Sequence, residues 1–189
     1  MKALEVLPEG YREIYAIDLQ KDKKTSVLVN ALAVALAAAM AAVMQFFVPF
    51  DTIYDGDNTF LKLGVILLGM VVYMLLHELV HGIAMKLCGT RKVKYGFTGM
   101  YAFAGSQDHY AKKPYIFIAL APIVLWGVVL ALINGVVPLD WFWVVYVIQI
   151  INISGAAGDL FVTVKFSRMP KDILVQDYGV GMTVYSKET

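Results

Sequence analysis

Two histidines and a glutamate stand close together near the end of a long apolar run. His77 and His81 are four residues apart, and Glu78 directly follows the first of them. On a helix this spacing places both imidazoles on one face, one turn apart, where they can bind the same metal ion. The Glu78 carboxylate can lie beside the open position of that metal and take a proton from a bound water. The pattern therefore predicts a zinc site that catalyses hydrolysis.

The apolar surroundings of this motif argue against a chance match. The chain has three histidines, and two of them flank Glu78. Ionisable side chains are costly inside a membrane and mark a functional site there by default. The alternative is a polar cluster that braces neighbouring helices without a metal.

The composition is that of a membrane protein. Of the 189 residues, 59% are hydrophobic and only 16% are charged, which differs from the usual balance of a soluble domain. The formal net charge of +1 gives no indication of nucleic-acid binding. The single cysteine, Cys88, excludes an internal disulfide and a zinc–thiolate site.

Four stretches are long and apolar enough to cross a hydrocarbon core of about 30 Å as helices. We therefore expect an all-α membrane protein with four transmembrane helices, the second of which carries the histidine motif. Its expected parts are a cytoplasmic N-terminal segment (1–26), a four-span membrane domain with the metal site (27–164) and a cytoplasmic C-terminal tail (165–189). The expected spans are residues 27–49, 61–87, 115–137 and 141–164.

The loop between the second and third spans, residues 88–113, predicts a small β-hairpin. Two runs rich in aromatic residues, 93–97 and 100–104, flank Thr98 and Gly99, which suit a tight turn. A hairpin beside a peptidase site can pair with an extended substrate. The alternative is a surface loop with aromatic anchors at the membrane interface.

The two polar ends of the chain carry weaker signals. Residues 13–19 could form a short strand or an interfacial segment, and the tail could form a short strand or a loop packed under the membrane domain. The N-terminal segment is long and carries several acids, so we expect no cleaved signal peptide.

Topology brings the chemical groups to one depth. Lysine and arginine concentrate at the two ends and in the loop 88–113, so the positive-inside rule predicts that both termini are cytoplasmic. His77 and His81 then lie in the cytoplasmic half of the second span, and Asp159 lies in the cytoplasmic half of the fourth. Water must reach this depth, and we expect looser packing at Gly155, Gly158 and Pro122, because an internal proline frees a backbone carbonyl.

A catalytic zinc site needs a third protein ligand besides the two histidines. Two neutral histidines, Asp159 and Glu78 around a divalent ion sum to zero charge. Choosing His109 instead would leave Asp159 without a partner, which is costly in a low-dielectric site. We therefore favour Asp159 over His109, with Asp108 and Asp177 as less plausible candidates.

With these residues identified, the chain resembles two groups of proteins. A membrane-embedded motif from His77 to His81, an aspartate two spans later and a hairpin-like loop between them are similar to the site-2 protease class of intramembrane zinc metalloproteases. From Leu7-Pro8-Glu9-Gly10 to Asp159, the chain more closely resembles a family of small bacterial and archaeal membrane proteins called "putative zincin peptidases". It has Gly158-Asp159-Leu160 where site-2 proteases carry Leu-Asp-Gly.

The resemblance implies a zinc-dependent intramembrane or membrane-surface endopeptidase in a prokaryotic plasma membrane, acting on a peptide or membrane-protein substrate. Glu78 would be catalytic, and His77, His81 and Asp159 would hold the zinc. Asn152, two turns before Asp159, would bind the substrate backbone or the oxyanion. The alternative for Asn152 is a buried asparagine that ties two helices together. The alternatives for the protein are a non-catalytic metal-binding membrane regulator or scaffold, and a four-helix protein without metal.

Overall fold

The computed structural model describes residues 3–18, 21–54, 58–99 and 102–187. The chain divides into two compact units, each built from separate stretches of sequence. The first unit consists of Met1–Leu28, Glu78–Pro122 and Asp159–Thr189, and the second consists of Val29–His77 and Ile123–Gly158.

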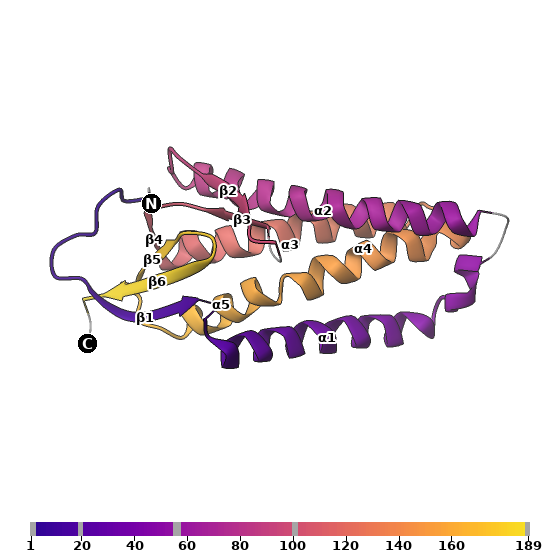
Figure 1. Cartoon of the computed structure of the whole chain (residues 1–189), viewed down its shortest axis with the longest axis horizontal. Helices are drawn as coiled ribbons and strands as arrows, with labels where there is room; N and C mark the ends of the chain where they lie inside the picture. Colours follow the sequence, from indigo (N-terminus) through magenta and orange to yellow (C-terminus); the bar gives the residue numbers. More distant parts are fainter. Residues whose placement is uncertain (1–2, 19–20, 55–57, 100–101, 188–189) are drawn as a thin grey trace. The chain divides into compact units, whose positions relative to one another are not determined.

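Four helical segments are long and apolar enough to cross a membrane, as the sequence predicted (Figure 1). Three of them are single helices: α1 (Lys23–Gln45), α2 (Thr59–Leu87) and α3 (Lys112–Asn134). The fourth, Leu139–Ser167, is interrupted. It comprises the short 3-10 helix η2 (Leu139–Trp141), α4 (Phe142–Gly155) and α5 (Ala157–Ser167). The predominantly helical four-span fold is thus confirmed.

The predicted hairpin is present in the first unit. Strand β2 (Lys94–Phe97) pairs antiparallel with β3 (Ala102–Gly105). Gly99 has a φ of 89°, a left-handed conformation that glycine adopts without the cost of a Cβ. The first two residues of the predicted second run, 100–101, lie outside the described residues.

A second sheet in the first unit was predicted only in fragments. It contains four antiparallel strands in the order β1-β6-β5-β4, and it joins three pieces of sequence that are far apart (Figure 1). The N-terminal segment and the tail both form strands, so the strand alternative holds for each. The strands are β1 (Arg12–Asp18), β4 (His109–Ala111), β5 (Leu174–Asp177) and β6 (Gly181–Ser186).

One apolar core connects this sheet to the helices of the first unit. Val175 in β5 lies opposite Val184 in β6, and both are fully buried. They pack in one cluster with Phe166 of α5, Ile118 of α3 and Met85 of α2. Burying large apolar side chains is the main favourable contribution to folding. The sheet therefore holds the adjoining parts of α2, α3 and α5 in place.

The second unit has its own core and a buried cation. Trp143 of α4 is buried and donates a hydrogen bond from Nε1 to the carbonyl of Pro49 at 3.2 Å. Near the start of α2, the Lys62 side chain is only 1% exposed. Its Nζ lies 3.1 Å from Oδ2 of Asp140 and donates to the carbonyl of Ile53 at 3.3 Å. The paired carboxylate makes burial of this ammonium tolerable.

We expect Asp140→Asn to lower the free energy of unfolding by about 1 to 2 kcal/mol, because the buried ammonium of Lys62 loses its carboxylate partner. This is below the several kcal/mol of a fully buried pair, since Asp140 is 38% exposed. Unfolding by denaturant in detergent micelles measures the change. Adding Lys62→Met should recover part of the loss. A double variant that is less stable than the single Asp140→Asn variant would contradict this account.

Candidate metal centre

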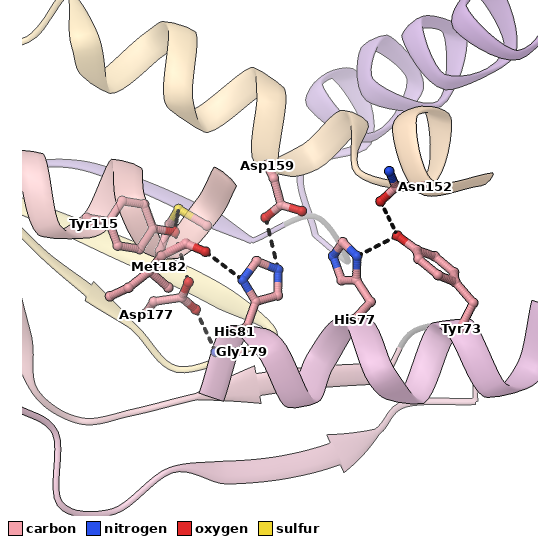
Figure 2. A network of polar contacts seen from close by, with 10 residues as sticks. Tyr73, His77, His81, Tyr115, Asn152, Asp159, Asp177, Gly179 and Met182 are labelled. Carbon is pink, nitrogen blue, oxygen red and sulfur yellow. Dashed lines mark hydrogen bonds and ion pairs between the residues drawn. The ribbon is translucent and has the colours of Figure 1, made fainter. Parts of the chain in front are cut away.

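His81 of α2 has a defined partner at each ring nitrogen. Nδ1 lies 2.9 Å from the backbone carbonyl oxygen of Ile118 in α3, and Nε2 lies 3.5 Å from Oδ1 of Asp159 in α5. A carbonyl oxygen can only accept, so Nδ1 carries the proton. In the neutral ring Nε2 is then the lone-pair nitrogen, and it points at the Asp159 carboxylate (Figure 2).

Asp159 lies just after an interruption in the fourth helical segment. Helix α4 ends at Gly155, and α5 begins at Ala157. Between them, Ala156 departs from helical geometry, with φ −85° and ψ 19°. Asp159 therefore lies in the first turn of α5, where the helix dipole stabilises a carboxylate. The break falls in the region where we expected looser packing, whereas Pro122 is fully buried.

His77 lies one turn before His81 on the same continuous helix. Its Nδ1 is 2.8 Å from the hydroxyl of Tyr73, and that hydroxyl donates to Oδ1 of Asn152 at 2.8 Å (Figure 2). The amide nitrogen of Asn152 donates to the carbonyl of Ile123 at 3.2 Å. Both amide atoms of Asn152 are thus hydrogen-bonded within the protein, as expected for an asparagine that ties helices together. Substrate binding by Asn152 stays a prediction.

The favoured ligand set forms one group suited to a metal ion. His77, His81 and Asp159 each offer one ligand atom, and these atoms lie within 4.8 Å of one another. Nε2 of a neutral His81 and the Asp159 carboxylate oxygen are two acceptors, so a cation between them is favourable, whether it is a second ring proton or a metal ion. A divalent ion could also bind His77, which lies in the same group. Two imidazoles and a carboxylate are also a donor set that zinc accepts in catalytic sites. The residues therefore fit a zinc ion.

The remaining candidates have other surroundings. Glu78 is half-buried on α2 between the two histidines. His109 lies in β4, with Nδ1 3.3 Å from the carbonyl of Leu4. The backbone N–H of Asp108 donates to the hydroxyl oxygen of Ser106 at 3.0 Å. Neither His109 nor Asp108 belongs to the metal group found among the described residues.

Asp177 belongs to a polar network that the sequence did not reveal. Its carboxylate accepts hydrogen bonds from the Tyr115 hydroxyl at 2.8 Å and from the Gly179 N–H at 2.9 Å (Figure 2). Burial raises the pKa of the Asp177 carboxyl above its ordinary value of 3.8, although both hydrogen bonds act in the opposite direction. Tyr115 is 62 residues away in the chain. The contact could have been expected only if the tail strand that ends at Asp177 had already been placed in the sheet.

Gly82, directly after His81, provides a close contact with the hairpin. A Cβ atom on Gly82 would lie 1.9 Å from the hydroxyl oxygen of Tyr95 in β2. Glycine at this position leaves room for the end of the Tyr95 side chain against the helix. One side chain of the hairpin thus contacts the residue that follows the second histidine.

Four apolar helices with a His-His-Asp group are the features of a membrane protein with a candidate metal site. The chain belongs to the family described as "Putative zincin peptidase", whose model matches residues 70–174. That stretch contains Glu78, Asn152 and all three candidate ligands. The family description indicates zinc and a metallopeptidase, and hence a hydrolase.

A curated relative comes from Pyrococcus woesei and is named "Uncharacterized 24.7 kDa protein in gap 5'region". It is 30% identical over 127 residues, which cover 62% of this chain and 53% of the relative. The chain thus spans about half the length of the curated relative that it matches. No solved structure matches the chain.

We expect Gly82→Ala to be less stable than Gly64→Ala by about 1 kcal/mol, because both gain helix propensity but only the methyl group at position 82 displaces the half-exposed Tyr95 ring. Gly64→Ala is a matched control on the same helix, since no atom lies within 4 Å of its added Cβ. Denaturant unfolding measures both changes. Combined with Tyr95→Ala, which removes the obstruction, Gly82→Ala should cost clearly less. Equal costs in both backgrounds would show that the overlap is not the cause.

The pKa of Asp177 predicts a pH dependence of stability. The folded-state pKa of Asp177 is raised, so the protonated carboxyl group is favoured by folding. Its contribution to the free energy of unfolding is fully present below pH 3.8, the ordinary value, and is lost as pH rises through the folded pKa. The unfolding midpoint should therefore fall over this pH range. Asp177→Asn should therefore weaken the fall in unfolding midpoint above pH 3.8. Tyr115→Phe removes a hydrogen bond that lowers the Asp177 pKa, so the fall should move to higher pH. A shift to lower pH would contradict the assignment.

Proposed function

We propose that this protein is a zinc-dependent endopeptidase that works within the membrane or at its surface. His77, His81 and Asp159 would hold the zinc ion, and Glu78 would be the proton-transfer group. The observation that carries the proposal is the 3.5 Å approach of the Asp159 carboxylate to Nε2 of His81. His77 lies one helical turn away in the same group, and the three side chains together would match the number of protein ligands in a catalytic zinc site.

The chemistry is hydrolysis of a peptide bond. Zinc in this site would polarise the scissile carbonyl and lower the pKa of a neighbouring water. Glu78 takes a proton from the attacking water and delivers it to the leaving amine as the C–N bond breaks. The half-buried position of Glu78, next to His77 and one turn from His81, suits a group that must meet both solvent and substrate.

The four apolar helices fit a membrane protein, and we propose that it lies in a prokaryotic plasma membrane with both termini in the cytoplasm. The candidate ligands occupy the ends of α2 and the fourth segment that adjoin the basic loop and tail. By the positive-inside rule this is the cytoplasmic side. A peptide or membrane-protein substrate would reach the site from there, and the hairpin β2–β3 offers backbone groups that an extended chain can pair with.

Glu78→Gln tests this function directly. We expect the variant to retain its zinc and to lose peptidase activity by at least 100-fold, because the amide cannot accept the proton of the attacking water. Zinc content is measured by elemental analysis of the purified protein, and activity by cleavage of a fluorescent casein in detergent. Glu13→Gln in strand β1 is a matched control with the same change of charge. It should retain both zinc and activity.

Two outcomes would overturn the proposal. A protein that binds zinc, but whose wild type and Glu78→Gln variant behave alike, would be a non-catalytic metal-binding regulator or scaffold. A protein that is free of metal after purification and does not bind added zinc would have no metallopeptidase site. His81→Ala completes the set, since it should lose zinc and activity together.

A further inference from the structure

We propose that Pro122 and the Tyr73–Asn152 pair are positioning residues that fix both candidate zinc-binding histidines in the same tautomer. In that tautomer Nδ1 carries the proton and Nε2 offers its lone pair to the metal. The inference deepens the proposed function and rests on it, because the metal-binding role of His77 and His81 is part of that function. Two separate arrangements of hydrogen bonds, on different helices, have this effect, and no single sequence motif contains them.

The first device is a carbonyl made available by a proline. Helix α3 continues through Pro122, but proline has no N–H, so the carbonyl of Ile118, four residues earlier, lacks its usual helical donor. Ile118 is only 1% exposed, and an unpaired carbonyl is costly where no water reaches it. His81 supplies the missing donor through Nδ1 at 2.9 Å. The proline therefore creates the acceptor that orients His81.

The second device is a chain of hydrogen bonds with only one consistent direction. The carbonyl of Ile123 can only accept, so the Asn152 atom that lies 3.2 Å from it is the amide nitrogen. The other amide atom, Oδ1, accepts the hydroxyl proton of Tyr73 at 2.8 Å. A hydroxyl has one proton, so the Tyr73 oxygen must accept from Nδ1–H of His77. Tyr73, His77 and Asn152 are all buried, which protects this order from competing water.

Both devices give the same result at the ligand atoms. In neutral His77 and His81 alike, Nδ1–H is held by an acceptor and Nε2 is left as the coordinating nitrogen. Residues that orient metal-binding histidines in this way typically contribute 10- to 100-fold to metal affinity. They would do so here without touching the metal or the substrate.

Zinc affinity of the full-length protein in detergent tests the two devices separately. Titration of Zn²⁺ against a chelator of known affinity should show a 10- to 100-fold weaker site in Tyr73→Phe, in which His77 has lost its acceptor. Pro122→Ala restores an N–H that competes with His81 for the Ile118 carbonyl, so it should also weaken zinc binding by 10-fold or more. Pro122→Ala should also make helix α3 more regular. If Pro122 served only to shape the helix, zinc affinity would not change.

Each variant has a matched control. Tyr146→Phe removes another tyrosine hydroxyl of the second unit, one that donates to the carbonyl of Met40 at 3.4 Å. Pro114→Ala removes a proline from the first turn of α3, where no helical N–H is required. Both controls should bind zinc like the wild type. Substitution of Co²⁺ gives a second readout, since its visible absorption reports a distorted site in Tyr73→Phe and Pro122→Ala only.

The tautomers can also be measured without any variant. Nitrogen-15 NMR of the metal-free wild type should show protons on Nδ1 of both His77 and His81 at a pH where the rings are neutral. A proton on Nε2 of either ring, or unchanged zinc affinity in both test variants, would overturn the positioning role while leaving the proposed peptidase intact. Failure of the wild type to bind zinc would instead remove the proposed function, and this inference with it.

Discussion

The candidate site depends on one imidazole ring with an acceptor at each end. His81 donates to a backbone carbonyl of α3 through Nδ1 and faces the carboxylate of Asp159 in α5 through Nε2. One acceptor determines where the proton of the neutral ring lies, and the other favours a positive charge at the opposite nitrogen, from a second proton or from a metal ion. Three helices contribute to this contact, so their relative placement within the first unit decides whether a metal can bind.

Apolar packing fixes that placement, because each polar group shares a helix face with core residues. Met85 follows His81 by four residues on α2, and Val162 follows Asp159 by three on α5. These spacings put core and site on the same side of each helix. The side chain of Ile118 is itself buried in this core, while its carbonyl receives the proton of His81. The site is therefore built on the edge of a dry, close-packed layer.

The sequence predicted those parts of the structure that depend on local spacing. Long apolar runs indicated the four helices, and two aromatic runs around Thr98 and Gly99 indicated the hairpin. Charge balance, which is not a local signal, favoured Asp159 over His109; Asp159 lies near the two histidines, and its role as a ligand stays a prediction. The four-stranded sheet was predicted only as possible strands at the two ends of the chain, because its strands are short and pair across most of the chain. The acceptors of the histidines were missed for a related reason. A backbone carbonyl has no residue type to recognise, and the Tyr73–Asn152 contact joins residues 79 positions apart.

The strand order also bears on how the protein is made. β6 lies between β1 and β5, and β5 separates β6 from β4, so the first strand to leave the ribosome has no partner until the last one has emerged. Pairings between such distant segments form late and slowly. The core that supports His81 and Asp159 therefore closes only after residues 181–186 have been translated. A nascent chain that has not yet reached β6 would therefore hold His81 and Asp159 in an unfinished core, after the helices that carry them have already been made.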